Sequence, residues 1–168
     1  MIINREALIR FAPMVGMFQS KRTENGVSCG LAEAGYDIRI RQTVAFSRPR
    51  NYMDFHHTVG EALPILGRFA LASAMEEFNM PEMLCGVVHD KSTWARQGLS
   101  VFNTVIEPGW KGFLTLELVY HGNDPLIIPA GSGIAQVLFH QTALPASYTG
   151  KYQNQADEPV SSIFEETK

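Results

Sequence analysis

The sequence predicts a mainly β domain, built as a barrel or a sandwich of short strands. Several segments alternate apolar and polar residues with the period of a half-buried strand. Turn-forming residues separate these segments throughout the chain, which contains 14 glycines and 9 prolines. Strong helix signals are few, and short strands with frequent turns are typical of barrels and sandwiches.

Three short helical segments are expected along the chain, before and between the strands. Residues 4–10 should form two turns of helix, because Asn4 is a good capping residue and an apolar pair follows it. Residues 73–78 could form a further short turn that ends near Pro81. Residues 92–98 predict a single capped turn that Gly98 closes.

Four segments predict strands, and two predict loops. Residues 36–41 and 112–120 alternate clearly, and in the second segment every other residue from Leu114 to Leu118 shares an apolar face. Residues 126–128 and 134–140 predict two shorter strands. Residues 47–62 and the polar tail, residues 141–168, are expected to be loops without a packed core of their own.

Composition indicates one intracellular domain over residues 1–168. The chain has a mass of 18.7 kDa and a net charge of −3, which gives no basic field to attract nucleic acid. It contains no apolar run of membrane-spanning length and no signal-peptide pattern. Cys29 and Cys85 are isolated, so we expect reduced thiols and a cytoplasmic location.

The segment from residue 89 to 120 carries the most chemical information. Lys91, Ser92, Thr93 and Arg96 lie at the start of the predicted turn 92–98, where backbone N–H groups and cations can bind phosphates. Spacing of four residues places Ser92 and Arg96 on one face of that turn. An ordinary helix cap with solvated charges explains the same residues about equally well.

Two carboxylates nearby are candidates for acid–base chemistry. Glu107 precedes a Pro-Gly turn, whereas Glu117 stands within an otherwise apolar strand. Apolar surroundings would raise the pKa of Glu117 and suit a general acid or base. Alternation by itself favours the other interpretation, in which Glu117 lies on the solvent face of a half-exposed strand.

The five histidines show no metal-binding spacing. The chain lacks the zinc-deaminase and metalloprotease signatures, and it also lacks a Walker loop and a dinucleotide glycine fingerprint. We therefore expect no zinc site. The segment from Lys151 to Gln155 offers a cation, a phenol and amides that could close over an anionic ligand, although composition alone favours a solvated tail.

Seven short motifs follow one another over nearly the whole chain. They begin at residues 34–38 (AGYDI), 71–81 (LASAMEEFNMP) and 91–98 (KSTWARQG). They continue at residues 105–112 (VIEPGWKG), 114–118 (LTLEL), 133–137 (GIAQV) and 150–155 (GKYQNQ). Single motifs of this kind are weak, but their shared order is specific, and together they resemble the dCTP deaminase/dUTPase superfamily, in its dCTP deaminase-like branch.

The resemblance implies a distorted β-barrel that assembles as a homotrimer, with nucleotide sites between subunits and Mg²⁺ bound through the triphosphate. Glu117 would be the general base, which activates water for attack on cytosine without zinc. Ser92 and Arg96 would position that water and the leaving amine. The resemblance also assigns nucleotide binding to a larger set, namely Lys91, Ser92, Thr93, Glu107, Gln136, Tyr148, Lys151 and Gln155.

The resemblance leaves three functions open. The first is a hydrolase that converts dCTP to dUTP and ammonia in pyrimidine deoxynucleotide metabolism. The second is a dUTP diphosphatase, or a bifunctional enzyme that carries dCTP through to dUMP, in which Glu107 orients the attacking water. The third is a non-catalytic nucleotide-binding regulator. Lys91 and Glu107 stand where the family usually has Arg and Asp.

Overall fold

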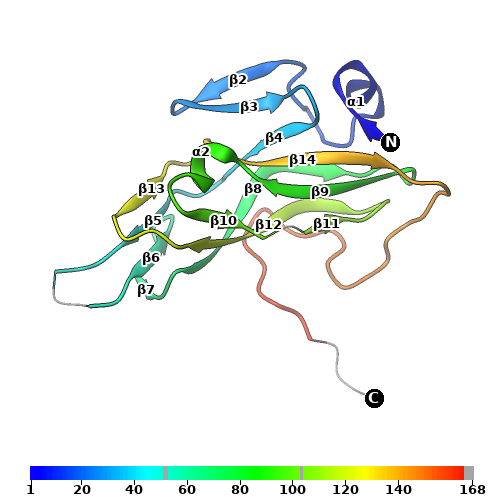
Figure 1. Ribbon diagram of the computed structural model, residues 1–168. Coiled ribbons are helices and arrows are strands. Elements are labelled where there is room, and N and C mark those ends of the chain that lie inside the picture. The colour runs from blue at the N-terminus through cyan, green and yellow to red at the C-terminus, as the bar shows by residue number, and fades with distance from the viewer. Residues whose placement is uncertain (51–52, 103, 165–168) are drawn as a thin grey trace.

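The computed structural model describes residues 1–50, 53–102 and 104–164. Its described residues form two short helices and fourteen strands (Figure 1). In chain order they are β1 (Ile2–Ile3), α1 (Arg5–Phe11), β2 (Lys21–Glu24), β3 (Val27–Leu31), β4 (Tyr36–Arg39), β5 (Val44–Ser47), β6 (His56–Val59), β7 (Ile65–Leu66), β8 (Phe69–Asn79), β9 (Leu84–Asp90), α2 (Ser92–Ala95), β10 (Leu99–Val101), β11 (Val105–Ile106), β12 (Lys111–Tyr120), β13 (Leu126–Ile128) and β14 (Gly133–Gln141).

The mainly β class is confirmed, but strand pairing in the described residues does not close one barrel. The strands form three sheets, ordered β11-β9-β14-β4-β3-β2 with β1 beside β14, then β10-β12-β8, and β13-β5-β6-β7. An isolated bridge between Ala74 of β8 and Ile40, which follows β4, lies where a continuous ladder would be needed. The pairing of β8 with β12 also changes register at Phe113–Thr115 of β12, an irregularity of the kind that bends a strand.

Most predicted elements are confirmed. Segments 36–41 and 126–128 contain β4 and β13, while segments 112–120, 134–140 and 4–10 match β12, β14 and α1 to within one residue at each end. Asn4 occupies the cap position of α1 but makes no cap hydrogen bond, since its amide donates to the Glu33 carbonyl at 2.7 Å. The turn at 92–98 contains α2, and Gly98 follows it with a φ of 88°.

The expected helical turn at residues 73–78 is wrong, because that segment lies within β8. Burial alternates along the strand, and Ala74, Glu76 and Phe78 all point inward. The alternation is hard to recognise in the sequence, because the charged residue Glu76 occupies one of the buried positions. It is buried because the Arg39 side chain pairs with it at 2.9 Å, and the Arg39 backbone N–H also donates to it.

The two expected loops have different outcomes. Segment 47–62 contains β6, which pairs with β5 and β7, so the loop prediction is wrong there, and residues 51–52 lie outside the described residues. After β14, the described part of the tail, residues 142–164, has no helix or strand. Figure 1 shows this tail turning back beneath β11 and β12 before it reaches the C-terminus.

The β12 strand is covered on both faces, and this places the candidate site. Leu116 and Leu118 lie in the core, as the alternation predicts. On the opposite face Thr115 is also buried, because the tail crosses it and the Val160 backbone N–H donates to its hydroxyl at 3.0 Å.

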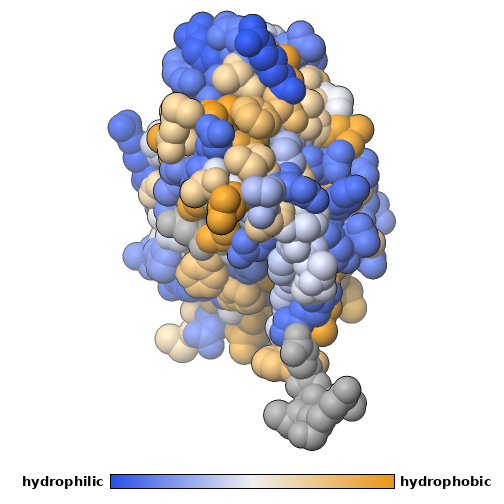
Figure 2. Space-filling model, turned by 90° about the vertical axis from the view of Figure 1, so that its right-hand side faces the viewer, coloured by the Kyte–Doolittle hydropathy of each residue, from blue (hydrophilic) through white to orange (hydrophobic). Residues whose placement is uncertain are grey.

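Hydrophobic residues are frequent across the middle of the molecular face that Figure 2 shows, while hydrophilic residues gather near its top. Within the described residues, neither helix is long and apolar enough to cross a bilayer.

Candidate nucleotide-binding pocket

A pocket of about 490 Å³ opens between β12, the segment around β11 and the tail. Strands β8 and β12 supply one wall, and the turn after β11 supplies a second. The tail, which crosses over β12, supplies the third. The lining residues are Phe69, Leu71, Thr104, Val105, Ile106, Glu107, Trp110, Leu114, Thr115, Glu117, Tyr148, Tyr152, Gln155, Val160 and Ser162.

Glu117 faces this pocket from β12, opposite Leu71 of β8. The side chain is half-buried, and its Oε2 atom is buried without a hydrogen-bond partner among the described residues. Burial raises the pKa of the Glu117 carboxyl, because an ion is poorly solvated there. Glu117 lies on the face of β12 opposite the core, as alternation indicates, and residues of the tail and the β11 segment line the pocket around it.

Glu107 lines the same pocket but in a different environment. It follows β11 and is exposed, and its carbonyl accepts a hydrogen bond from the Trp110 backbone N–H at 3.1 Å, which closes the Pro108-Gly109 turn. One pocket thus contains a desolvated carboxylate and a solvated one. Different surroundings allow two carboxylates to serve different roles.

The tail brings two further predicted residues to the pocket. Tyr148 and Gln155 both line it, and the backbone of Gln155 bridges to Gly112 at the start of β12. Lys151 does not line the pocket. Its side chain is exposed, and its ammonium lies 5.4 Å from the centre of the Tyr152 ring.

The predicted anion-binding turn lies apart from this pocket within one chain. Ser92, Thr93 and Arg96 are exposed on or beside α2, and none of them lines the pocket. The turn is anchored by Trp94, which is buried and donates from its indole N–H to the Gly133 carbonyl at 2.7 Å. The outward faces of Ser92, Thr93 and Arg96 are thus left open to a ligand.

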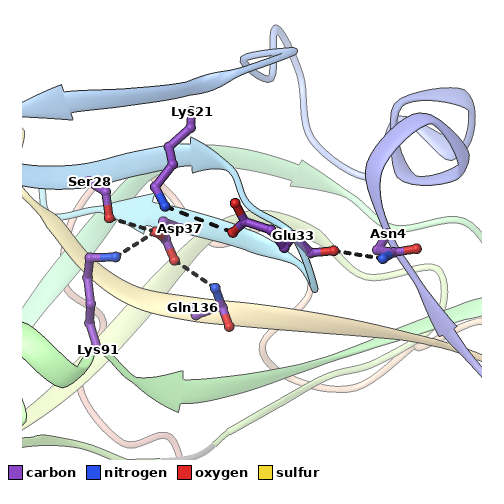
Figure 3. A network of polar contacts seen from close by, with 7 residues as sticks. All are labelled: Asn4, Lys21, Ser28, Glu33, Asp37, Lys91 and Gln136. Carbon is purple, nitrogen blue, oxygen red and sulfur yellow. Dashed lines mark hydrogen bonds and ion pairs between the residues drawn. The ribbon is translucent and has the colours of Figure 1, made fainter.

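Two predicted nucleotide-binding residues instead contact a buried carboxylate that the sequence analysis did not select. Figure 3 shows Lys91 and Gln136 pointing toward Asp37. The Lys91 ammonium lies 2.5 Å from Asp37 Oδ2, and the Gln136 amide donates to Oδ1 at 3.0 Å. Ser28 donates to Oδ2 at 3.2 Å. Asp37 is only 3% exposed, so these partners compensate for its desolvation, and a nucleotide-binding role for Lys91 or Gln136 stays a prediction.

Sequence reasoning also missed the pocket residues Trp110, Tyr152 and Thr115. The missed signal is the pair of glycines at 109 and 112, which flank Trp110 and have φ values of 72° and 126°. Such positions indicate a close approach of another segment, and the tail makes that approach. The partner segment cannot be identified from the glycines alone.

The fold and the pocket indicate a mainly β protein in which a desolvated carboxylate faces a largely apolar pocket. A family model described as dCTP deaminase-like matches residues 21–142. The dCTP deaminase of Acidobacterium capsulatum is 34% identical, with 92% of this chain and 96% of that protein covered. The dCTP deaminase of Campylobacter lari is 38% identical, with 82% and 83% covered. The chain belongs to the dCTP deaminase-like family.

Solved structures agree on the fold. The 2'-deoxycytidine 5'-triphosphate deaminase from Agrobacterium tumefaciens superposes with a TM-score of 0.55 at 16% identity, over 84% of this chain and 48% of that chain. A point-mutant dUTPase from phage phi11 of S. aureus superposes with a TM-score of 0.51 at 15% identity, over 71% and 84%. The deaminase and the dUTPase thus share this architecture.

Proposed function

We propose that the chain is a zinc-independent dCTP deaminase, which converts dCTP and water to dUTP and ammonia. The observation that carries the proposal is Glu117, a half-buried carboxylate with an unpartnered Oε2 in the pocket of a dCTP deaminase-like protein. The named relatives that cover most of the chain are dCTP deaminases.

Glu117 acts as the general base in this proposal. It takes a proton from water and passes it to N3 of cytosine while the water oxygen adds to C4. The proton of the resulting C4 hydroxyl then moves to the amino group, the C4–N bond breaks, and ammonia leaves a carbonyl at C4. The raised pKa of Glu117 suits proton transfer nearer neutral pH. Ser92 and Arg96 position the water and the leaving amine, while Thr93, Tyr148, Lys151 and Gln155 bind the nucleotide, with Lys151 reaching it as the tail, residues 141–168, closes as a lid.

The separation of α2 from the pocket supports a site shared between subunits. One chain places Glu117 in the pocket and leaves Ser92 and Arg96 exposed outside it. In the proposed homotrimer, α2 of one subunit completes the pocket of its neighbour, within a distorted β-barrel arrangement of the sheets. We place this trimer in the cytoplasm, where Cys29 and Cys85, both free here, stay reduced.

Metal chemistry is not assigned to the protein's own residues. The described residues contain no group of three or more His, Cys, Asp or Glu side chains that could hold a metal ion. A structural Mg(II) ion is named for the phage phi11 dUTPase. In this proposal Mg²⁺ arrives with the triphosphate, and none of the steps above passes through it. The absence of zinc remains a prediction.

Glu107 favours a second activity at the same pocket. It lies exposed in the pocket that holds Glu117, where it could orient water toward phosphorus. A dUTP diphosphatase or a bifunctional enzyme would then release pyrophosphate and dUMP.

One assay separates the candidate functions. Purified protein is incubated with Mg²⁺ and either dCTP or dUTP, and ammonia, dUTP, dUMP and pyrophosphate are quantified. Ammonia and dUTP in equal amounts from dCTP support the deaminase, whereas added dUMP and pyrophosphate indicate the bifunctional enzyme. Release of pyrophosphate from dUTP without release of ammonia from dCTP would support the diphosphatase. Nucleotide binding without turnover would support the non-catalytic regulator.

A further inference from the structure

The tail is held to the pocket by a side chain that does not itself line the pocket. Gln153 belongs to the tail, and its amide contacts only backbone atoms. Its Oε1 accepts hydrogen bonds from the Lys111 N–H at 2.7 Å and the Asn154 N–H at 3.3 Å. Its Nε2 donates to the Gly109 carbonyl at 3.0 Å and the Tyr148 carbonyl at 2.9 Å. Both hydrogens and both lone pairs of this amide are therefore used.

Backbone contacts continue the attachment on both sides of Gln153. The Trp110 indole N–H donates to the Tyr152 carbonyl at 2.6 Å, and the Asn154 N–H donates to the Lys111 carbonyl at 2.9 Å. The Phe113 N–H donates to the Gln155 carbonyl at 3.1 Å. We call residues 108–113 and 148–155, joined in this way, the tail clamp.

Two glycines leave the space that the tail clamp needs. A Cβ at Gly112 would lie 2.5 Å from the backbone nitrogen of Gln155 and 2.7 Å from its oxygen. A Cβ at Gly109 would lie 2.6 Å from Ser147 Oγ. Backbone atoms cannot move as a flexible side-chain end can, so a side chain at Gly112 would displace the tail.

The tail clamp connects residues that belong to the candidate site. Its first segment, residues 108–113, follows Glu107 directly, and its second segment, residues 148–155, contains Tyr148 and Gln155. The side chains of Glu107, Tyr148 and Gln155 all line the pocket together with Glu117. We propose that Gln153 is a positioning residue, whose amide fixes Tyr148 and Gln155 at the pocket for nucleotide binding. The expected effect on KM rests on the proposed function. The attachment of the tail to the pocket rests on the contacts alone.

Two variants test the tail clamp independently. Gln153→Glu keeps the size of the side chain but replaces two donors with a carboxylate that faces two carbonyl oxygens. Gly112→Ala leaves Gln153 intact and displaces Gln155. Asn154→Gly is the matched control, because the Asn154 side chain makes no hydrogen bond within the described residues and its backbone φ of 60° suits glycine.

The kinetic readout is the division between KM and kcat. If Gln153 positions nucleotide-binding residues, both variants should raise KM for dCTP about tenfold or more, with a smaller effect on kcat, because ground-state binding is lost. The control should retain the wild-type KM. A wild-type KM in both variants would overturn the inference.

A spectroscopic readout works even without turnover. Trp94 and Trp110 are the two tryptophans in the chain, and Trp110 is 5% exposed beneath the tail. In a Trp94→Phe background, Gln153→Glu and Gly112→Ala should expose Trp110 to acrylamide quenching, whereas Asn154→Gly should not. Unchanged quenching refutes the tail clamp whatever the activity.

If wild-type protein releases no ammonia but quenching changes as expected, the proposed function fails and the tail clamp stands. Loss of the folded circular dichroism spectrum in both variants would mean that Gln153 stabilises the fold and does not merely position the tail.

Discussion

Replacing Glu117 with Gln separates the charge of this carboxylate from its shape. The amide is nearly isosteric, so the packing against Leu71 and the pocket shape should be kept. An amide cannot take a proton from water, and a general base contributes about 10²–10⁴-fold to a rate. Ammonia release should therefore fall by about that factor, which is roughly 2.7–5.4 kcal/mol of activation free energy.

The same substitution should not destabilise the fold at neutral pH. Burial raises the pKa of Glu117 in the folded protein, so the folded state holds this proton more tightly than the unfolded state does. The stability that this group contributes is present below its unfolded pKa and is lost as pH rises through the folded pKa. A glutamine stays neutral, so Glu117→Gln should unfold at the same urea concentration as wild type, or at a higher one.

The assay measures ammonia release and urea unfolding on the same preparations. Glu77→Gln is the matched control, because Glu77 is exposed on the neighbouring strand β8 and does not line the pocket. That control should keep both properties. The decrease from Glu117→Gln should appear in kcat more than in KM, since proton transfer occurs only in the transition state. Wild-type ammonia release from Glu117→Gln would refute the deaminase mechanism.

Three further predictions follow from the same geometry. In a pH profile of kcat/KM, the acid limb should lie above the ordinary glutamate pKa of about 4.3, because Glu117 must be ionised to act and burial raises its pKa; a limb at the ordinary value would contradict this. Equal mixtures of Glu117→Gln and Arg96→Ala subunits, refolded together, should regain about a quarter of wild-type activity if each site takes Glu117 from one subunit and Arg96 from its neighbour. Half of the subunits supply an intact Glu117 and half supply an intact Arg96, so about one site in four has both. No recovery of activity would place the site within one chain. Lys91→Met should lower the free energy of unfolding by about 3–5 kcal/mol, because it leaves Asp37 buried and unpaired, and adding Asp37→Asn should restore part of the loss; urea unfolding of the single and double variants measures both.

Much of the fold follows from local patterns in the sequence. The alternation in β4, β12 and β14 reports which residues point inward, because successive side chains in a strand lie on opposite faces. The pattern fails where a buried charge interrupts it. Glu76 looks like a surface residue in the sequence, and only its pairing with Arg39 across the sheets shows how a charged residue lies on the buried face of β8.

For the site, the candidate residues and the family follow from sequence motifs and their order. The motifs contain Glu117, Glu107 and Gln155, the resemblance adds Tyr148, and the structure brings all four to one pocket. Motif order cannot state which residues share a cavity, because contacts between segments far apart in the chain arise only when the sheets pack.

The environment of each group depends on contacts between distant segments. Alternation assigns Glu117 to the face opposite the core, yet folding leaves it half-buried in the pocket, and this burial raises its pKa. The sequence presents Lys91 as a free cation, yet folding places it on Asp37. Gln153 has no distinguishing local pattern, and its role depends on backbone atoms of a segment more than forty residues earlier. Charge and burial are set by what lies across the fold, and a linear pattern records only what lies along the chain.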